Sequence, residues 1–309
     1  MQYGFGVDLG GTTAKIALFS GEGELLCKWE IPTRTQNNGA EILPDIAASV
    51  LNCLRERNIP KDAVLGVGIG VPGPVDGDGI VPACDNLGWG RTDISRELEA
   101  LVGLRVVAGN DATVAALGEY WACGGTGKSM VMVTLGTGVG GGIIVDGKPL
   151  HGTHGAAGEI GHLVLNTEET DYCNCGKRGC AAQYSSATGI VRLAKAYLAS
   201  HREDSCLRGR EFTCKDVFDA AGAEDVAAQA ILEQVYNYLG LLIANVCIVL
   251  NPSQVVIGGG VSKAGEPLLA GLKRYFDKYI YHASTQVEFR LATLGNDAGS
   301  YGAFRLLLG

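Results

Sequence analysis

Val7-Asp8-Leu9-Gly10-Gly11-Thr12-Thr13 forms a glycine-rich turn between two strand-like runs near the start of the chain. The stretch Val133-Thr134-Leu135-Gly136-Thr137-Gly138-Val139-Gly140 repeats this arrangement much farther along the sequence. Because two strand–loop–strand units of one kind indicate an internal repeat, we expect two related domains. The repeat further predicts that these domains face one another across a cleft.

Strand-like and helical patterns alternate along the chain, which is typical of α/β layers. We predict strands at 3–9, 15–19, 25–31, 64–71, 105–108, 129–135, 143–145, 255–257 and 287–292, with a glycine loop at 136–142. We predict helices at 40–57, 93–102, 112–122, 187–200, 225–250, 266–279 and 298–308, the second capped by Asp93. The predicted fold class is therefore α/β, with mixed sheets flanked by helices in both domains.

Composition limits the class of protein. The chain has 309 residues, is 47% hydrophobic and carries a formal charge of -8 at pH 7, which argues against nucleic-acid or anionic-membrane partners. Seven of the ten cysteines are scattered and no signal peptide is recognisable, which fits a reducing cytosol. The longest apolar stretch, 239–250, is shorter than a membrane span. We expect a soluble cytoplasmic protein.

One cluster of soft metal ligands stands out. His162, Cys173, Cys175 and Cys180 supply one imidazole and three thiols, the four ligands that tetrahedral zinc requires. Such a closed set leaves no open coordination position, so the predicted zinc is structural. The alternative is that these are ordinary buried cysteines beside a surface histidine. A polar, glycine-bearing segment is poor core material, so the sequence favours zinc.

The two glycine turns are candidate phosphate sites. Successive backbone N–H groups in a sharp turn form a concavity for anions, and side chains would block the approach of phosphate oxygens. Thr12, Thr13 and Thr137 add hydroxyl donors. Asp8 lies at an otherwise apolar strand end, where it would either bind Mg²⁺ on a nucleotide or cap the adjacent loop.

Two further segments have both an ordinary and a functional interpretation. Gly258-Gly259-Gly260 follows an apolar strand and would let adenosine approach the backbone, although strand ends in α/β proteins are often rich in glycine. Asn110-Asp111 opens a helix after a strand, so it is either a helix cap or a site with Asp111 as general base. Gly127-Lys128-Ser129 lacks the spacing of a P-loop and precedes a strand, so we exclude that interpretation.

Taken together, these segments resemble the ROK family of bacterial sugar kinases, in the actin-like ATPase and hexokinase superfamily, and its glucokinase branch most. The resemblance covers nearly the whole chain. It rests on Asp8-Leu9-Gly10-Gly11-Thr12, Gly70-Val71-Pro72-Gly73-Pro74, Asn110-Asp111-Ala112, Leu135-Gly136-Thr137-Gly138-Val139-Gly140-Gly141-Gly142, Gly158-Glu159-Ile160-Gly161-His162 with the three cysteines, and Ile257-Gly258-Gly259-Gly260-Val261.

The resemblance implies a kinase that uses ATP and Mg²⁺ to phosphorylate a hexose, expected to be glucose, at its 6-hydroxyl. Asp111 would accept the hydroxyl proton, and the sugar ring would contact Gly73, Asn110, Glu159 and His162. The nucleotide would contact Asp8, Gly10, Gly11, Thr12, Thr13, Lys15, Thr137, Gly138, Gly258, Gly259 and Gly260.

The resemblance also implies an organisation into two actin-like domains. A small domain would comprise residues 1–118 and 294–309, and a large one residues 119–293, including the zinc-binding loop at 162–180. By the same analogy we expect a homodimer.

One position departs from the family pattern. Members usually carry Leu-Glu after the last cysteine, the glutamate accepting hydrogen bonds from the sugar, whereas Ala181-Ala182-Gln183 follows Cys180 here. Either Gln183 takes over this role, or the acceptor is another hexose or N-acetylhexosamine (N-acetylglucosamine, N-acetylmannosamine, fructose or allose), or the protein is a degenerate sugar sensor. A transcriptional repressor is disfavoured, because strand residues begin at Tyr3 without a preceding helix-turn-helix.

Overall fold

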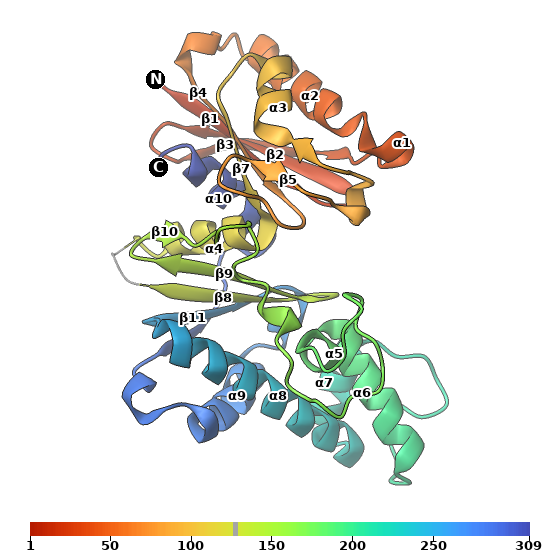
Figure 1. Ribbon diagram of the computed structural model, residues 1–309. Helices are drawn as coiled ribbons and strands as arrows, with labels where there is room; N and C mark the ends of the chain where they lie inside the picture. The colour runs from red at the N-terminus through yellow and green to blue at the C-terminus, as the bar shows by residue number, and fades with distance from the viewer. Residues whose placement is uncertain (126–128) are drawn as a thin grey trace. The chain divides into compact units, whose positions relative to one another are not determined.

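The computed structural model describes residues 1–125 and 129–309, and the chain forms two compact units. Unit 1 comprises Met1–Lys128, Gly142–Gly158 and Thr293–Gly309, and unit 2 comprises Ser129–Gly141 and Glu159–Ala292. Both units combine strands with helices, as the sequence predicts (Figure 1). Gly127 and Lys128, in the tripeptide that we excluded as a P-loop, lie outside the described residues.

The two five-stranded sheets share one strand order, which confirms the internal repeat. The first has the order β3-β2-β1-β4-β7 and the second β10-β9-β8-β11-β12, so the strands of both glycine turns hold equivalent places. Both sheets are mixed, since each contains parallel and antiparallel pairs. The strands are β1 Tyr3–Leu9, β2 Thr13–Ser20, β3 Leu25–Pro32, β4 Val64–Val71, β5 Ile80–Val81, β6 Thr92–Asp93, β7 Val106–Asn110, β8 Met130–Leu135, β9 Val139–Val145, β10 Lys148–Pro149, β11 Gln254–Gly258 and β12 Glu288–Leu291.

Every helix predicted from the sequence is present, and Asp93 caps its helix by accepting a hydrogen bond from the backbone of Arg96. The α-helices are α1 Gln36–Gly39, α2 Ile42–Glu56, α3 Ile94–Val102, α4 Asp111–Ala122, α5 Ala182–Ser185, α6 Ala187–Ser200, α7 Cys214–Gly222, α8 Val226–Leu250, α9 Glu266–Tyr279 and α10 Ala298–Leu306. The 3-10 helices are η1 Lys61–Ala63, η2 Asp85–Leu87, η3 Ile160–His162, η4 Gly260–Ala264, η5 His282–Ser284 and η6 Gly295–Asp297.

One predicted loop is too long. The sequence predicts a glycine loop at 136–142, but β9 already begins at Val139. A Cβ atom on Gly142 would lie 2.4 Å from the carbonyl oxygen of Ala112 in α4, so this glycine permits close packing within a strand. The glycine turn itself is therefore limited to the residues between Leu135 and Val139.

Alternation along the strands divides the core of unit 1 into two layers. Ile16 and Leu18 of β2 belong to the core that includes α2 and α3, whereas Ala17 and Phe19 pack with Phe304 of α10. Helix α10 therefore covers the opposite face of the sheet from α2 and α3 (Figure 1).

Glycine lets α10 approach the sheet at backbone distance. A Cβ atom on Gly6 of β1 would lie 2.0 Å from the carbonyl oxygen of Ser300, and one on Gly68 of β4 would lie 1.7 Å from that of Ala303. Any larger residue at either position would push α10 away. This packing fixes the beginning of α10 against the end of β1, where Asp8 lies.

The compact units differ from the predicted domains in where they divide the chain. Residues 119–128, 142–158 and 293, expected in the large domain, belong to unit 1. The buried carboxylate of Glu119 accepts hydrogen bonds from the backbone N–H groups of Thr293 and Leu294 at 3.0 and 2.7 Å. Helix α4 is thereby joined near its C-terminal end to the segment that precedes α10.

Helix α8 is the apolar centre of unit 2. The helix begins at Val226, so it is longer than the apolar stretch at 239–250 that the sequence analysis considered. By length and composition it could therefore cross a membrane. However, 61% of its most apolar window is buried within the protein. It packs against α9, where Gly271 allows contact with the ring of Tyr236. We therefore interpret α8 as a core helix.

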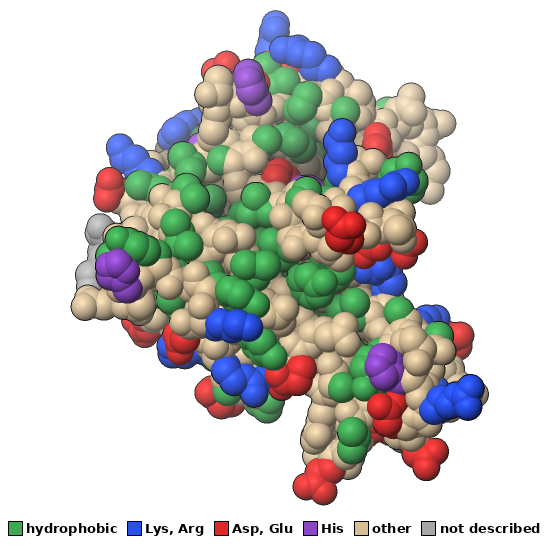
Figure 2. Space-filling model, turned by 60° about the horizontal axis from the view of Figure 1, so that its bottom comes forward, with side chains coloured by type: hydrophobic (Ala, Val, Ile, Leu, Met, Phe, Trp, Pro, Cys, Tyr) green, Lys and Arg blue, Asp and Glu red, His purple; other side chains and the backbone are tan. Residues whose placement is uncertain are grey.

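Charged side chains of both signs are intermixed on the face of the protein that Figure 2 shows.

Candidate functional site

The four predicted metal ligands come together in unit 2. The Nδ1 atom of His162 and the Sγ atoms of Cys173, Cys175 and Cys180 all lie within 4.8 Å of one another. Nδ1 lies 3.9 Å from Sγ of Cys173, and the sulfurs of Cys175 and Cys180 are 3.6 Å apart. Ligand atoms around tetrahedral zinc are separated by about 3.8 Å, so the arrangement suits this ion.

Glycines allow the chain to fold back around this cluster. Gly176 and Gly179 have φ angles of +79° and +76°, a region that side chains with a Cβ rarely adopt. The backbone N–H of Cys173 donates to the carbonyl of Lys177 at 2.7 Å, which closes the hairpin. The backbone of this hairpin therefore favours glycine at both positions.

The two ring nitrogens of His162 face different groups. Nδ1 faces the thiols, whereas Nε2 lies 3.9 Å from the Glu159 carboxylate. Both side chains are 43% exposed, so they are accessible to a ligand. A metal on Nδ1 would leave the proton on Nε2, and His162 would then be a fixed hydrogen-bond donor.

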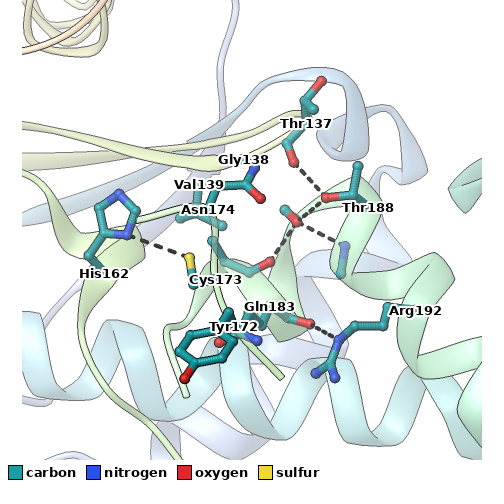
Figure 3. Close-up of a pocket in the computed structure, with 13 residues that line it drawn as sticks. Thr137, Gly138, Val139, His162, Tyr172, Cys173, Asn174, Gln183, Thr188 and Arg192 are labelled. Carbon is teal, nitrogen blue, oxygen red and sulfur yellow. Dashed lines mark hydrogen bonds between the residues drawn. The ribbon is translucent and has the colours of Figure 1, made fainter. Parts of the chain in front are cut away.

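A cavity of 250 Å³ joins the metal cluster to the second glycine turn (Figure 3). Its walls include Thr137 and Gly138 from the turn and His162 and Cys173 from the cluster. The sequence placed these residues in separate motifs. It singled out Gln183 only as a replacement for the missing glutamate, and it did not single out the other polar groups of the cavity, which are Tyr172, Asn174, Ser186, Thr188 and Arg192.

The substitution noted after the last cysteine opens onto this cavity. Ala182 lines it, and the neighbouring Gln183 is 8% exposed. The Gln183 side chain accepts a hydrogen bond from the backbone of Cys180 at 3.1 Å and donates one to the carbonyl of Asp171 at 3.0 Å. Because backbone groups already engage both ends of its amide, Gln183 is not available to replace the missing carboxylate.

Arg192 links the cavity wall to the loop that precedes the cysteines. It donates a hydrogen bond to the carbonyl of Gln183 at 3.3 Å (Figure 3). It also donates to Glu169 at 2.8 Å and to Asp171 at 3.1 Å. Tyr184 also donates to Glu169, at 2.6 Å. Burial alone would raise the pKa of Glu169, but hydrogen bonds from Tyr184, the backbone of Asp171 and the Arg192 cation lower it to about 2.

This network predicts how stability depends on pH. The pKa of Glu169 falls from an ordinary 4.5 to about 2 on folding, so its contribution is complete above pH 4.5 and is lost as pH falls toward 2. In that window unfolding takes up one proton at Glu169, which adds a slope of up to about 1.4 kcal/mol per pH unit. We expect Glu169→Gln to remove this slope in denaturant titrations at several pH values. An unchanged slope would show that other carboxylates cause the acid sensitivity.

Asn110 and Asp111 lie together in unit 1. Asn110 caps α4, because its Oδ1 accepts a hydrogen bond from the backbone of Thr113 at 3.0 Å. Its Nδ2 donates to the carbonyl of Gly73 at 3.0 Å and to Oδ1 of Asp111 at 3.1 Å. Gly73 itself has a φ of +88°. The capping interpretation of Asn110 is therefore confirmed, and the same side chain orients the carboxylate of Asp111.

Asp8 lies at the end of β1 with Lys15 beside it. The Lys15 ammonium is 3.6 Å from the carboxylate, and a Cβ atom on Gly299 of α10 would lie 2.5 Å from Asp8 Cγ. Burial raises the pKa of Asp8, while the Lys15 charge opposes that rise. Asp8 is thus a crowded carboxylate that a cation would stabilise.

The first glycine turn is held by residues that follow β3. The backbone N–H of Gly10 donates to the carbonyl of Thr13 at 2.9 Å and closes the turn. Thr33 donates its hydroxyl proton to the carbonyl of Gly10 at 2.8 Å and its N–H to that of Thr12 at 2.8 Å. The turn is therefore fixed in one conformation.

In the second turn, packing within the protein does not explain the glycines. A Cβ atom on Gly136 or Gly138 would meet no atom of the described residues within 4 Å, and neither glycine has a positive φ. The space that a side chain would fill is open. This is the arrangement expected where a ligand approaches the backbone.

The glycines after β11 serve two purposes. Gly259 has a φ of +82°, and a Cβ there would lie 2.5 Å from the carbonyl oxygen of Leu135. Gly260 instead lines a second cavity of 430 Å³, together with Phe218 and Val261. A planar, largely apolar ligand suits this cavity. The sequence analysis missed Phe218 because it predicted no α7, although Thr213 and Asp216 form a capping box at its start.

The predicted residues thus gather in both units. Unit 1 holds the first turn, Asp8, Lys15, Gly73, Asn110 and Asp111, and unit 2 holds the second turn, Glu159, the metal ligands and Gly258–Gly260.

Comparison with known proteins gives a consistent picture. The chain is 45% identical to a glucokinase of Halalkalibacterium halodurans, over 96% of this chain and 92% of that protein. It is 33% identical to an N-acetylmannosamine kinase of Escherichia coli, over 98% and 97%. A ROK family glucokinase from Streptomyces griseus, solved with glucose and AMPPNP, has 31% identity and a TM-score of 0.77, covering 98% of each chain.

The fold agreement confirms the predicted α/β class of the actin-like superfamily. The model of the ROK family matches residues 4–309. This chain belongs to the ROK family.

Proposed function

We propose that this protein is an ATP-dependent hexose kinase that transfers the γ-phosphate of ATP to the 6-hydroxyl of glucose. The observation that carries the proposal is 45% identity to a glucokinase over 96% of the chain. The site supports it, because both glycine turns, Asp111 and the His162 region are present in one chain. Phosphoryl transfer requires positioning and charge neutralisation more than covalent chemistry from the protein.

We propose that Asp111 is the general base for the sugar hydroxyl. Its Oδ1 is held by the backbone N–H of Ala112 at 2.7 Å and by Asn110, which orients the carboxylate at the start of α4. The proton of the 6-hydroxyl would move to this carboxylate as the oxygen attacks phosphorus. Asn110 would act mainly by positioning Asp111, since both its donors already bind the protein.

We propose that Gly10–Thr13 and Thr137-Gly138 bind the phosphates through backbone N–H groups. The open space at Gly136 and Gly138 supports this assignment. The cavity at Gly260 suits adenosine, with the ring against Phe218. Asp8 would belong to the Mg²⁺ shell; Mg²⁺ typically takes one or two carboxylates, phosphates and water, and it would neutralise charge on the phosphates. Lys15 would balance Asp8 when no cation is bound.

We propose that His162, Cys173, Cys175 and Cys180 hold one structural zinc ion. The donor set and the 3.6 and 3.9 Å separations fit the ion, which would supply a tetrahedral cross-link within the loop. His162 Nε2 would then donate a hydrogen bond to one sugar hydroxyl, and the Glu159 carboxylate would accept one from another.

An ADP-release assay with ATP, Mg²⁺ and a panel of hexoses and N-acetylhexosamines tests the proposed function. Glucose is expected to give the highest kcat/KM. ADP release with none of these sugars would reject the kinase proposal and favour a sugar sensor. A higher kcat/KM with an N-acetylhexosamine would keep the kinase and change the acceptor.

The alanine at position 182 favours N-acetylhexosamines as the alternative acceptors. An alanine offers no acceptor for a ring hydroxyl and leaves room in the cavity beside His162. An N-acetylhexosamine carries an acetamido group in place of a hydroxyl, so the missing acceptor would cost it less binding free energy than it costs glucose.

We expect Ala182→Glu to lower the KM for glucose by about 10- to 150-fold, because a hydrogen bond to a charged acceptor contributes roughly 1.5–3 kcal/mol. The matched control is Ala182→Gln, which has similar size without the charge. Steady-state kinetics of both variants measure the effect. An equal KM in all three proteins would show that this position does not contact the sugar.

We also propose that the protein forms a homodimer and that it is located in the cytoplasm. Light scattering of the purified protein would measure its mass in solution.

A further inference from the structure

A pair of cysteines lies outside every group of residues used above. Cys27 belongs to β3, an edge strand, and Cys53 to α2, a helix that shares one hydrophobic core with it. Both are free thiols. Cys27 is partly buried against the same core that contains Cys53, which is 8% exposed.

The register between β3 and α2 places these thiols opposite one another. The indole of Trp29 donates a hydrogen bond to the Ser49 hydroxyl at 2.8 Å, which fixes one point of contact. Cys27 lies two residues back on the same face of the strand, a step of about 6.8 Å. Cys53 lies one turn farther along the helix, a step of about 6 Å. The step along the strand and the step along the helix have similar lengths, so we infer that Cys27 and Cys53 lie near one another.

The surroundings of Cys53 agree with this register. Burial raises the pKa of the Cys53 thiol to about 11, the neighbouring Cys27 adds to the rise, and Arg57 opposes it. Cys53 therefore rests as a neutral thiol. Cys27 is the more exposed of the two.

We propose that Cys27 and Cys53 form a reversible thiol–disulfide site that reacts with low-molecular-weight disulfides. The inference is independent of the proposed kinase activity, because neither residue belongs to the sites assigned to ATP, sugar or zinc.

The reaction balances in two exchange steps. The thiolate of Cys27 attacks one sulfur of the small disulfide, forms a mixed disulfide and releases one small thiolate. Cys53 then loses its proton to solvent and attacks the Cys27 sulfur, which releases the second small thiolate. The protein loses two electrons and two protons, and the small disulfide is reduced to two thiols.

The disulfide would tie the edge strand to its covering helix. Thr33, immediately after β3, holds the carbonyls of Gly10 and Thr12, so the cross-link lies on the strand that supports the first glycine turn. A bond that closes the loop from Cys27 to Cys53 restricts the unfolded chain, so oxidation should raise Tm.

The test uses the full chain with zinc bound. The protein is incubated with oxidised glutathione, free thiols are alkylated, and peptides are mapped by mass spectrometry without reduction. We expect a Cys27–Cys53 linked peptide, the loss of two alkylatable thiols per chain, a higher Tm and full reversal by dithiothreitol. Trp29 emission is expected to fall, because a disulfide beside an indole quenches it.

Three variants make the result specific. Cys27→Ser should abolish the linked peptide, and Cys53→Ala should instead accumulate a glutathione adduct on Cys27. Cys206→Ser, which removes an exposed cysteine elsewhere, should behave like the original protein. The proposal is overturned if both thiols stay alkylatable, if a stable glutathione adduct remains on Cys27 in the unmutated protein, or if Cys27→Ser still loses two thiols.

Discussion

Asp111→Asn is expected to lower kcat for glucose phosphorylation by about 10²- to 10⁴-fold, the usual contribution of a general base. Asparagine keeps the shape of the side chain and can still accept the hydrogen bond from the backbone of Ala112. It cannot take a proton from the 6-hydroxyl. The KM for ATP should change little, because the proposed nucleotide contacts lie on other segments. Coupled-enzyme kinetics at saturating glucose measure the effect.

The control for this variant is Asp93→Asn. Asp93 is another carboxylate at a helix start, where it accepts a hydrogen bond from the backbone of Arg96 at 3.0 Å. Its replacement should leave kcat unchanged, so a loss confined to Asp111→Asn separates chemistry from helix capping. Zinc content should be the same in both variants. Normal turnover by Asp111→Asn would exclude Asp111 as the base.

Cys175→Ser is expected to abolish stoichiometric zinc binding and to lower kcat/KM for the sugar by about 10²-fold. A serine hydroxyl is a poor zinc ligand, and the remaining three ligands do not form a closed tetrahedral set. Without the ion, His162 would lose the constraint on Nδ1 that directs Nε2 toward Glu159. A displacement of about 1 Å in a positioning group can cost this factor in rate.

Metal analysis and steady-state kinetics measure these two consequences. Thermal unfolding should in addition show a lower Tm, because the metal cross-link is lost. The matched control is Cys123→Ser, since Cys123 is likewise exposed and lies away from the cluster. It should retain zinc, Tm and activity. If Cys175→Ser loses zinc but keeps its Tm and sugar kinetics, the ion does not organise the site.

Much of the fold could be predicted because its signals are local. Strand β1 and helices α6 and α9 have the predicted ends, since periodicity and flanking glycines depend on neighbouring residues. Helix α7 was missed because it has only 9 residues and its capping box was overlooked. The loop at 136–142 was overestimated because glycine at position 142 looks like a turn signal, yet it serves close packing against Ala112.

The candidate site could be predicted less completely. The metal ligands and glycine turns were found because their chemistry requires particular residue types at short spacing. The cavity residues Thr188 and Arg192 were not found, since they lie on a helix whose pattern is ordinary. Gln183 was considered as a replacement for the missing carboxylate, and only its hydrogen bonds to Cys180 and Asp171 argue against that role.

The sequence by itself determined the family, the α/β class, the repeat and the residue types of the site, because these depend on composition and short-range order along the chain. Tertiary structure alone decided which distant segments share a cavity and which polar groups are already satisfied. Thr137 and His162 are brought together in that way, and Cys27 and Cys53 come to share one core. The physical reason is that long-range packing depends on side-chain shape and backbone approach between elements, which spacing along the chain does not encode.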